Sequence, residues 1–456
     1  MCLPIYGLGI NLGFEHRNEH EYFQPDAAEE SGNLSGFGSA AVPINNSISV
    51  GEEFAELRAP LVQDKPFAKE LLFDTGFRHS DYSYAASPST IANTYKFEVQ
   101  YAPIEDYRMR VSYDKAIRAP SAVELYNPQL VGTFSFPADP CAPPITYTLL
   151  QCERTGVTAA QYANGSVPQG TGNQLSQLAG GNPNLKPETA ETYTVGFNFA
   201  PRQIPHFTGS IDYFHISVKG LINTLPANVI LSDCANTGNP VYCSQIVRQS
   251  NTGGLTGNNI ASGGYIIQTD VNIGAVLESG IDLQLAYHYD LPPGFGSLSA
   301  ELNGSYLQHF ESTPYVGAHT YDCAGLFGET CQTINPRWHH IFRTTWQTPW
   351  SVTASATWRF IGGVSQDNNS GDSTLHFSTF GNYDLFNPTI PSFSYLDLEA
   401  TWQVNRILQL RAGANNVLDK DPPIINNAII AGGGANTYDA YDQFGRQLFV
   451  AFTAKF

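Results

Sequence analysis

Long hydrophobic runs and charge are both scarce in this sequence. No stretch of about eighteen uninterrupted apolar residues occurs, which excludes transmembrane helices. Charged residues make up only 14% of the 456 residues, and 23 basic residues against 41 acidic ones leave a net charge of -18. Because no basic stripe is present to neutralise phosphates, we expect no nucleic-acid partner. If the chain spans a bilayer, it must do so with strands.

Several familiar motifs are also missing. Residues 1–10 contain no basic segment followed by an apolar core and a small-residue cleavage site, so no signal peptide is predicted. We expect either a protein that stays in the cytoplasm or the downstream part of a longer exported polypeptide. No Gly-x-Ser-x-Gly, paired-cysteine zinc site or phosphate-binding loop occurs. The sequence therefore predicts no enzyme activity, no catalytic residue and no cofactor.

Six of the seven cysteines fall into close couples. The couples are Cys141 with Cys152, Cys234 with Cys243, and Cys323 with Cys331. Each lies in a segment rich in Gly, Asn, Pro and Thr, which indicates a disulfide-pinned loop in an oxidising compartment. Metal binding is the alternative, but the couples lack the Cys-x-x-Cys spacing and nearby His partners of zinc sites. Cys2 is left over and is expected to be unpaired near a frayed end.

Aromatic residues and alternation are what the sequence has in abundance. Aromatics reach 12%, and residues 445–456 alternate strictly between two faces. One face is apolar throughout and contains Leu448, Val450, Phe452, Ala454 and Phe456. The other is mostly polar, and a strand with these two faces suits a wall between lipid and water.

Similar alternating segments recur along the whole chain. Counted from the C-terminus, they predict about fourteen strands, near residues 445–456, 408–414, 396–402, 352–360, 337–347, 298–306, 281–287, 207–222, 188–200, 107–119, 95–101, 71–83, 47–62 and 5–22. Short and long connections alternate along the chain, as in an antiparallel up-and-down barrel whose tight turns all lie on one side. All three cysteine couples then fall in long outer loops.

A soluble meander or propeller would show the same alternation. However, no self-similarity appears at a period of about forty to fifty residues. Aromatic residues near both strand ends, such as Tyr306 and Trp350, favour interfacial girdles instead.

Three segments carry a family resemblance. Residues 113–126 contain Arg118, Ala119 and Pro120 at the end of a strand. Residues 181–196 and 413–421 contain the other motif residues, which are Asn182, Pro183, Leu185, Lys186, Pro187, Glu188, Asn415, Asn416, Leu418 and Asp419. These segments resemble the barrel signatures of TonB-dependent outer-membrane receptors, and the resemblance extends from about residue 53 to the C-terminus.

The motifs also have a physical interpretation. Pro120 ends a strand because it cannot donate a ladder hydrogen bond, and Pro183 and Pro187 stiffen the loop that returns to the wall. The side chains of Asn415, Asn416 and Asp419 are suited to satisfying backbone groups at a bend.

The resemblance implies a location and a set of partners. Such receptors lie in the outer membrane of Gram-negative bacteria, contact its lipid, are inserted by the barrel assembly machinery and bind a small nutrient ligand. In that family a terminal aromatic residue, here Phe456, is the assembly signal. The receptors contact the TonB complex through a plug domain that this sequence does not contain.

The chain also departs from the family pattern. Those receptors have a signal peptide, a coupling segment, a plug and 22 strands, so residues 1–456 resemble the C-terminal portion of the barrel alone. An arc of about fourteen strands has two unpaired edges, near residues 5–22 and 445–456, and unpaired backbone groups in hydrocarbon are costly. We expect a truncated or split gene product, an incomplete barrel; the alternative is closure into a smaller porin-like passive channel.

Candidate ligand sites are few. Residues 15–21 hold two histidines among four acidic or amide side chains, but their register places His16 and His20 on the outward face above the membrane band, where rim polarity is ordinary. We therefore predict no metal site. Outer loops rich in Tyr, Asn, Asp and Gly are suited to a siderophore, haem, cobalamin or oligosaccharide, and the sequence assigns no substrate-binding residue.

Overall fold

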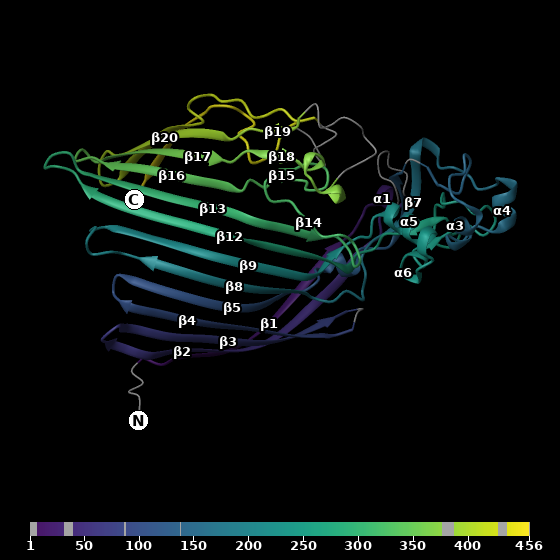
Figure 1. Ribbon diagram of the computed structural model, residues 1–456, viewed down its shortest axis with the longest axis horizontal. Coiled ribbons are helices and arrows are strands. Elements are labelled where there is room, and N and C mark those ends of the chain that lie inside the picture. The colour runs from purple at the N-terminus through teal and green to yellow at the C-terminus, as the bar shows by residue number, and fades with distance from the viewer. Residues whose placement is uncertain are drawn as a thin grey trace.

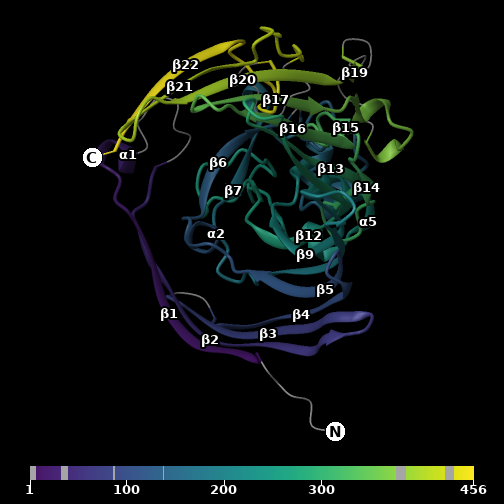
Figure 2. The same ribbon diagram turned by 90° about the vertical axis from the view of Figure 1, so that its left-hand side faces the viewer.

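A single curved sheet dominates the structure, a computed structural model that describes residues 7–31, 40–85, 88–136, 138–375, 387–426 and 436–455. Fourteen strands follow one another in chain order, each antiparallel to the next, and a short fifteenth strand, β14, pairs with β13. Figures 1 and 2 show these strands side by side in an arc. The expected number of wall strands and their antiparallel order are confirmed.

The wall strands match the predicted segments closely. They are β1 (Gly9–Phe23), β2 (Ile44–Lys65), β3 (Ala68–Tyr84), β4 (Thr90–Ile104), β5 (Tyr107–Arg118), β8 (Glu188–Phe199), β9 (Phe207–Asn223), β12 (Val271–Asp290), β13 (Ser297–Thr313), β16 (Trp338–Gln347), β17 (Val352–Ile361), β20 (Phe393–Gln403), β21 (Leu408–Asn415) and β22 (Gln447–Ala454); β14 is Tyr321–Asp322.

Alternation along each strand separates an apolar outer face from a polar inner one. Paired residues on neighbouring strands share a face, so Leu410 lies beside Phe452 outside, and Arg411 lies beside Ala451 inside. Phe452 is 73% exposed, and Val352, Ala356 and Leu396 are not buried between two layers either. The outer face of the wall is thus unpartnered by protein, as a lipid-facing surface requires.

Close contacts between glycines and aromatic rings shape the wall. A Cβ atom at Gly304 would lie 2.5 Å from the Trp338 ring, and one at Gly413 would lie 2.5 Å from the Phe449 ring. Rings laid over glycines in this way cover exposed backbone and help a sheet to curve.

The tight turns and the long connections lie at opposite ends of the wall, and the short link between β3 and β4 lies at the same end as the long connections. Six tight turns, at residues 66–67, 105–106, 200–206, 291–296, 348–351 and 404–407, join strands at one end. The longer connections lie at the opposite end (Figure 1). This is the predicted division into an inner and an outer side.

Two long outer connections fold together into a lobe, which we define as residues 119–187 and 224–270 without the undescribed residue 137. A second sheet, in the order β10-β11-β7-β6, forms its centre. Its elements are α2 (Ala122–Tyr126), β6 (Leu130–Ser135), α3 (Leu149–Arg154), α4 (Ala159–Asn164), η1 (Thr171–Asn173), β7 (Gln174–Ala179), α5 (Ala227–Thr237), α6 (Pro240–Cys243), β10 (Ile246–Val247) and β11 (Tyr265–Ile267). The lobe lies beyond the strand ends in Figure 1 and inside the arc in Figure 2, so it projects over the mouth.

The remaining outer connections are smaller. They include α1 (Ala27–Ser31), η2 (Asp367–Asn369), η3 (Ser373–Leu375) and a three-stranded sheet of β15 (Leu326–Phe327), β18 (Val364–Gln366) and β19 (Thr389–Ile390). Phe327 and Ile390 of this sheet are almost fully buried in an apolar cluster that also contains Tyr395 of β20.

The arc does not close on itself within the described part of the chain. β1 and β22 stand at the two ends of the strand order and are not paired with each other, and Figure 2 shows the gap between them. Among the described residues, no helix is both long enough and apolar enough to cross a membrane.

Candidate functional site

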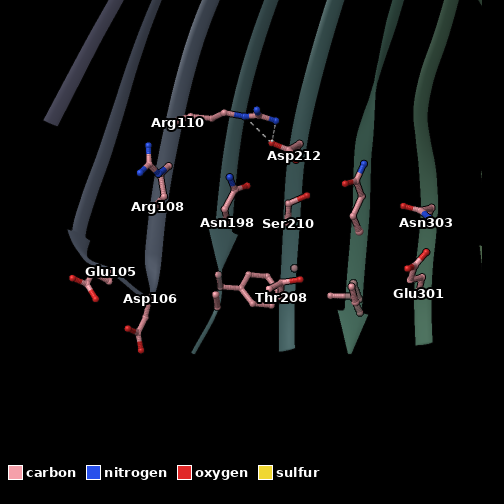
Figure 3. A pocket seen from close by; sticks show the side chains of 16 residues that line it. Glu105, Asp106, Arg108, Arg110, Asn198, Thr208, Ser210, Asp212, Glu301 and Asn303 are labelled. Atoms are coloured by element: carbon pink, nitrogen blue, oxygen red, sulfur yellow. Dashed lines mark hydrogen bonds and ion pairs between the residues drawn. The ribbon is translucent and has the colours of Figure 1, made fainter. Parts of the chain in front are cut away.

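The inner face of the wall carries a polar hollow of about 580 Å3 near the tight turns. Figure 3 shows its side chains on consecutive strands. Arg110 of β5 reaches over β8 to Asp212 of β9, with Nη2 and Nε at 2.7 and 3.1 Å from Oδ1. The residue beneath this ion pair is Gly196, where a Cβ atom would overlap the Asp212 carboxylate. A glycine at this position therefore lets the ion pair lie flat on the wall.

A second arginine lies at the edge of the hollow. Arg108 donates to Glu70 and to Gln100, each at 2.6 Å. Asn198, Ser210, Gln284, Glu301 and Asn303 complete a lining of hydrogen-bond donors and acceptors. Such a surface is suited to water or to a polar protein surface rather than to an apolar ligand.

Ion pairs also occur elsewhere on the inner face. Glu52 is buried beside Arg78 at 3.1 Å and accepts from Ser80 at 2.6 Å. Further inward-facing pairs are Lys96–Asp74 at 3.2 Å and Arg411–Glu399 at 2.7 Å.

Other inward-facing acids have no such partner. Glu301 and Asp282 have no cation within ion-pair distance among the described residues. Arg343, opposite Glu301 in the register of β13 and β16, likewise has no carboxylate within ion-pair distance among the described residues; its guanidinium donates to Ser355 at 3.2 Å.

The first two sequence motifs meet at the outer rim. Arg118, at the end of β5, lies between two carboxylates: it contacts Glu188 of β8 at 2.6 and 2.8 Å and Glu124 of α2 at 2.9 and 3.0 Å. Ser121 caps α2 and is bonded reciprocally to Glu124. Burial tends to raise the pKa of Glu124, but hydrogen bonds from Arg118 and the Ser121 backbone hold it below its usual value.

The rest of the second motif ties the lobe to the wall. The Asn182 amide donates to the Asp270 carbonyl at 2.8 Å, and the Lys186 backbone N–H donates to the Asn272 side chain at 2.8 Å. Leu185 is buried in a cluster against which Ala119 packs. Pro120 is buried, whereas Pro183 and Pro187 are half-buried. These residues hold the base of the lobe.

The third motif forms a bend after β21. Asn416 is fully buried with φ of 49°, and its amide both donates to and accepts from the Lys420 backbone at 2.9 Å. Asp419 accepts from the Arg446 backbone at 2.8 Å. Asn415 lines a cavity at the mouth, and Leu418 is exposed. The expected use of Asn and Asp side chains on local backbone groups is observed at Asn416.

The mouth cavity beside this bend encloses about 420 Å3. Arg359 of β17 lies at its wall and contacts Asp397 at 2.7 and 3.0 Å and Asp442 at 2.9 and 2.6 Å. The Arg359 guanidinium also lies over the Tyr395 ring, 4.8 Å from its centre. With Asp439 and Tyr441 in the lining as well, the cavity offers aromatic and acidic surface to a solute entering the lumen.

Three disulfides stiffen the outer loops. They join Cys141 to Cys152, Cys234 to Cys243, and Cys323 to Cys331, the couples expected from the sequence. Within the described ranges, no group of three His, Cys, Asp or Glu side chains is arranged to hold a metal ion. Phe456 and Cys2 lie outside the described residues.

A comparison with protein-family models identifies the family to which this chain belongs. The family model described as TonB dependent receptor-like, beta-barrel, matches residues 5–417. The chain belongs to this family. TonB-dependent receptors are outer-membrane β-barrels of Gram-negative bacteria, and their fold accounts for the two-faced wall and the long outer loops.

Solved structures of a receptor and two transporters share the fold. A mutant of the ferric enterobactin receptor of Pseudomonas aeruginosa, in complex with enterobactin, matches 98% of this chain and 51% of its own at 17% identity, with a TM-score of 0.62. The FrpB iron transporter of Neisseria meningitidis matches 98% of this chain and 52% of its own at 13% identity, with a TM-score of 0.52. The copper transporter OprC matches 98% of this chain and 54% of its own at 12% identity, with a TM-score of 0.52.

The chain spans about half the length of these structures. A comparison with curated proteins finds no match.

Two contacts that join loops to the wall of this TonB-dependent receptor barrel were not predicted from the sequence. The Arg118–Glu124 contact spans only six residues, and the Ser-x-x-Glu spacing at residues 121–124 is a capping signal that identifies α2. No comparable signal marks the ion pair of Arg359 with Asp442, because those residues lie 83 positions apart.

Proposed function

We propose that this chain is the C-terminal portion of the barrel of a TonB-dependent receptor that takes up a scarce nutrient through the outer membrane. The observation that carries the proposal is the fourteen-strand arc, which is apolar outside and charged inside. Membership of the family and the polar inner face support transport through the lumen that the wall encloses, rather than catalysis. Lipid and the barrel assembly machinery are the partners that such a wall requires, with Phe456 as the assembly signal.

The open edges support an incomplete barrel. The outer strand edges of β1 and β22 present backbone groups without partners from the described chain, and in hydrocarbon each such group costs several kcal/mol. We propose that strands from outside these 456 residues complete the ring, as in a truncated or split gene product. The porin-like alternative needs β1 to pair with β22, and the described residues of the two strands contain no such pairing.

Energy coupling would then come from a plug inside the completed barrel. The hollow around Arg110 and Asp212 lies on the inner face near the turns, and its polar lining suits contact with a folded plug. On this proposal TonB acts through that plug and not through the wall strands.

The acidic composition of the chain bears on the charge of the transported nutrient. The chain carries 41 acidic residues against 23 basic ones, and the inward-facing cations Arg110 and Arg411 are already paired with carboxylates. An acidic conduit attracts cations and repels anions through its summed field. We therefore favour a neutral or cationic nutrient, such as an oligosaccharide, a cobalamin or an uncharged siderophore complex, over a strongly anionic chelate.

The reading frame upstream of Met1 provides the most direct test. It should encode a plug and about eight further strands, and their genetic restoration should produce a heat-modifiable outer-membrane barrel. Intact upstream sequence without such a frame would overturn the truncation. Steady single-channel conductance from the purified chain alone would instead favour the self-closed channel.

A further inference from the structure

We propose that the inner turns form a lipid-binding ring that dips into the headgroup region of the inner leaflet. Five of the six tight connections carry one large exposed apolar residue, and at the sixth, residues 105–106, that residue is Ile104 at the end of β4; the six are 43% to 82% exposed. The turn ring consists of Phe67, Ile104, Ile204, Phe295, Trp350 and Ile407. The inference rests on the proposed placement in the outer membrane.

Residues of this kind are unexpected at tight turns. Turns favour Gly, Pro, Asn, Asp and Ser, which suit the backbone geometry and face water. Single exposed apolar residues are common on any protein surface. Recurrence in or directly beside all six connections of one end is a pattern, and it places apolar area where a hydrated rim would carry polar groups.

Two wall aromatics link the turn ring to the lipid-facing surface. Trp346 lies on the outer face of β16 beside Leu298, and its indole N–H donates to the Phe295 carbonyl at 2.8 Å. Tyr101, on the outer face of β4 beside Met109, donates its hydroxyl to the Phe67 carbonyl. Aromatic side chains with an apolar body and a bonded polar tip are typical of membrane interfaces.

The arrangement of the turns selects lipid over a protein partner. The six turns lie along the same end of the wall (Figure 1) and follow the whole arc (Figure 2). A bilayer interface reaches all of them at once, whereas a single globular partner would cover a few. The Trp346 and Trp350 rings, 6.2 Å apart, make the apolar surface continuous from the wall strand to the turn.

Site-directed labelling tests the turn ring in bilayers. In a Cys2→Ser background the other cysteines are disulfide-bonded, so Phe67→Cys and Ile407→Cys can each be labelled with a bimane fluorophore. Gln409→Cys, which faces the lumen beside Thr453 at the same end, is the matched control. Phe452→Cys marks the lipid-facing wall.

We expect phospholipids with a nitroxide near the headgroup to quench the labels at positions 67 and 407 several-fold more than the label at 409, with iodide showing the reverse order. Equal iodide quenching at 67, 407 and 409 would overturn the turn ring while leaving the wall intact. Protection that arises only after a periplasmic extract is added, without lipid quenching, would also overturn it in favour of a protein partner. Absence of lipid quenching at 452 would instead show that the wall is not in the bilayer, which overturns the proposed function and this inference with it.

Discussion

Arg248 and Asp139 form a two-point ion pair inside the lobe, with Nη1 2.6 Å from Oδ2 and Nη2 3.1 Å from Oδ1. Their side chains are 3% and 0% exposed, and they come from the two different connections that build the lobe. Arg248 also donates to the carbonyls of Thr155 and Gly253. The pair therefore joins the two loops at a point that water does not reach.

Removal of one partner should unfold the lobe locally. Asp139→Ala leaves the Arg248 guanidinium buried without its counter-ion, which typically costs about 3–5 kcal/mol. We expect rapid cleavage of residues 138–187 in limited proteolysis, with the wall strands unaffected. Glu105→Ala, which breaks exposed pairs with Lys69 and Arg202, is the control and should change little. Equal protease resistance of Asp139→Ala and the parent would contradict the prediction.

A methyl group added beneath Trp338 should destabilise the wall. Gly304→Ala places a Cβ atom 2.5 Å from the ring, so the ring must move, and overpacking of this kind costs about 1–3 kcal/mol. Gly51→Ala, on β2, meets no atom within 4 Å and should be neutral or slightly stabilising. Urea unfolding followed by tryptophan fluorescence measures both, and a similar midpoint for the two variants would refute the steric account.

The base of the lobe should weaken in acid. The pKa of Glu124 is lowered in the folded protein because Arg118 and the Ser121 backbone outweigh the effect of burial. Its contribution to stability is therefore present above the unfolded value of about 4.3 and is lost as the pH falls through the lower folded value.

Glu124→Gln should thus lower the urea midpoint of the lobe near neutral pH and converge with the parent in strong acid. Glu153→Gln, an exposed change on α3, should leave the pH profile of the parent unchanged. A constant difference between Glu124→Gln and the parent across the acid range would argue against the Arg118 contact.

Reduction of the disulfides should affect the outer loops alone. The three bonds close short loops with sequence separations of 11, 9 and 8, and cross-links of this size contribute about 2–3 kcal/mol each. We expect dithiothreitol to increase proteolysis of the lobe and of residues 323–331, whereas the heat-modifiable migration of the wall persists. The paired variant Cys141→Ser with Cys152→Ser should reproduce the part of the effect that arises in the lobe.

The wall could be predicted because its signal is local. A strand needs only period-two alternation and a turn at each end, so residues such as Leu410, Arg411 and Phe452 reveal both the strand and the face. The open edges at β1 and β22 followed from the count of strands. The cysteine couples were visible for the same reason, since each lies within one loop.

The lobe and the mouth could not be predicted from the sequence in the same way. The parallel pairing of β7 with β11 places Gln177 beside Ile266, almost ninety positions later, and Arg248 meets Asp139 across 109 positions. No short-range pattern distinguishes these residues from other polar or apolar loop residues. The Arg118 cluster is an intermediate case. The strand end at Pro120 could be predicted from the sequence, whereas the contact of Arg118 with Glu188 forms only because β5 pairs with β8.

The joint construction of the lobe limits how its two halves can change. Leu175 belongs to one connection, and Ile230, Leu231 and Leu255 belong to the other, yet all four are buried in one cluster. A substitution that enlarges a side chain in either half must be accommodated by the opposite half. Transplanting one of these loops into a related barrel without its companion would expose an unmatched apolar surface, so the two are expected to be exchanged, diversified or deleted together.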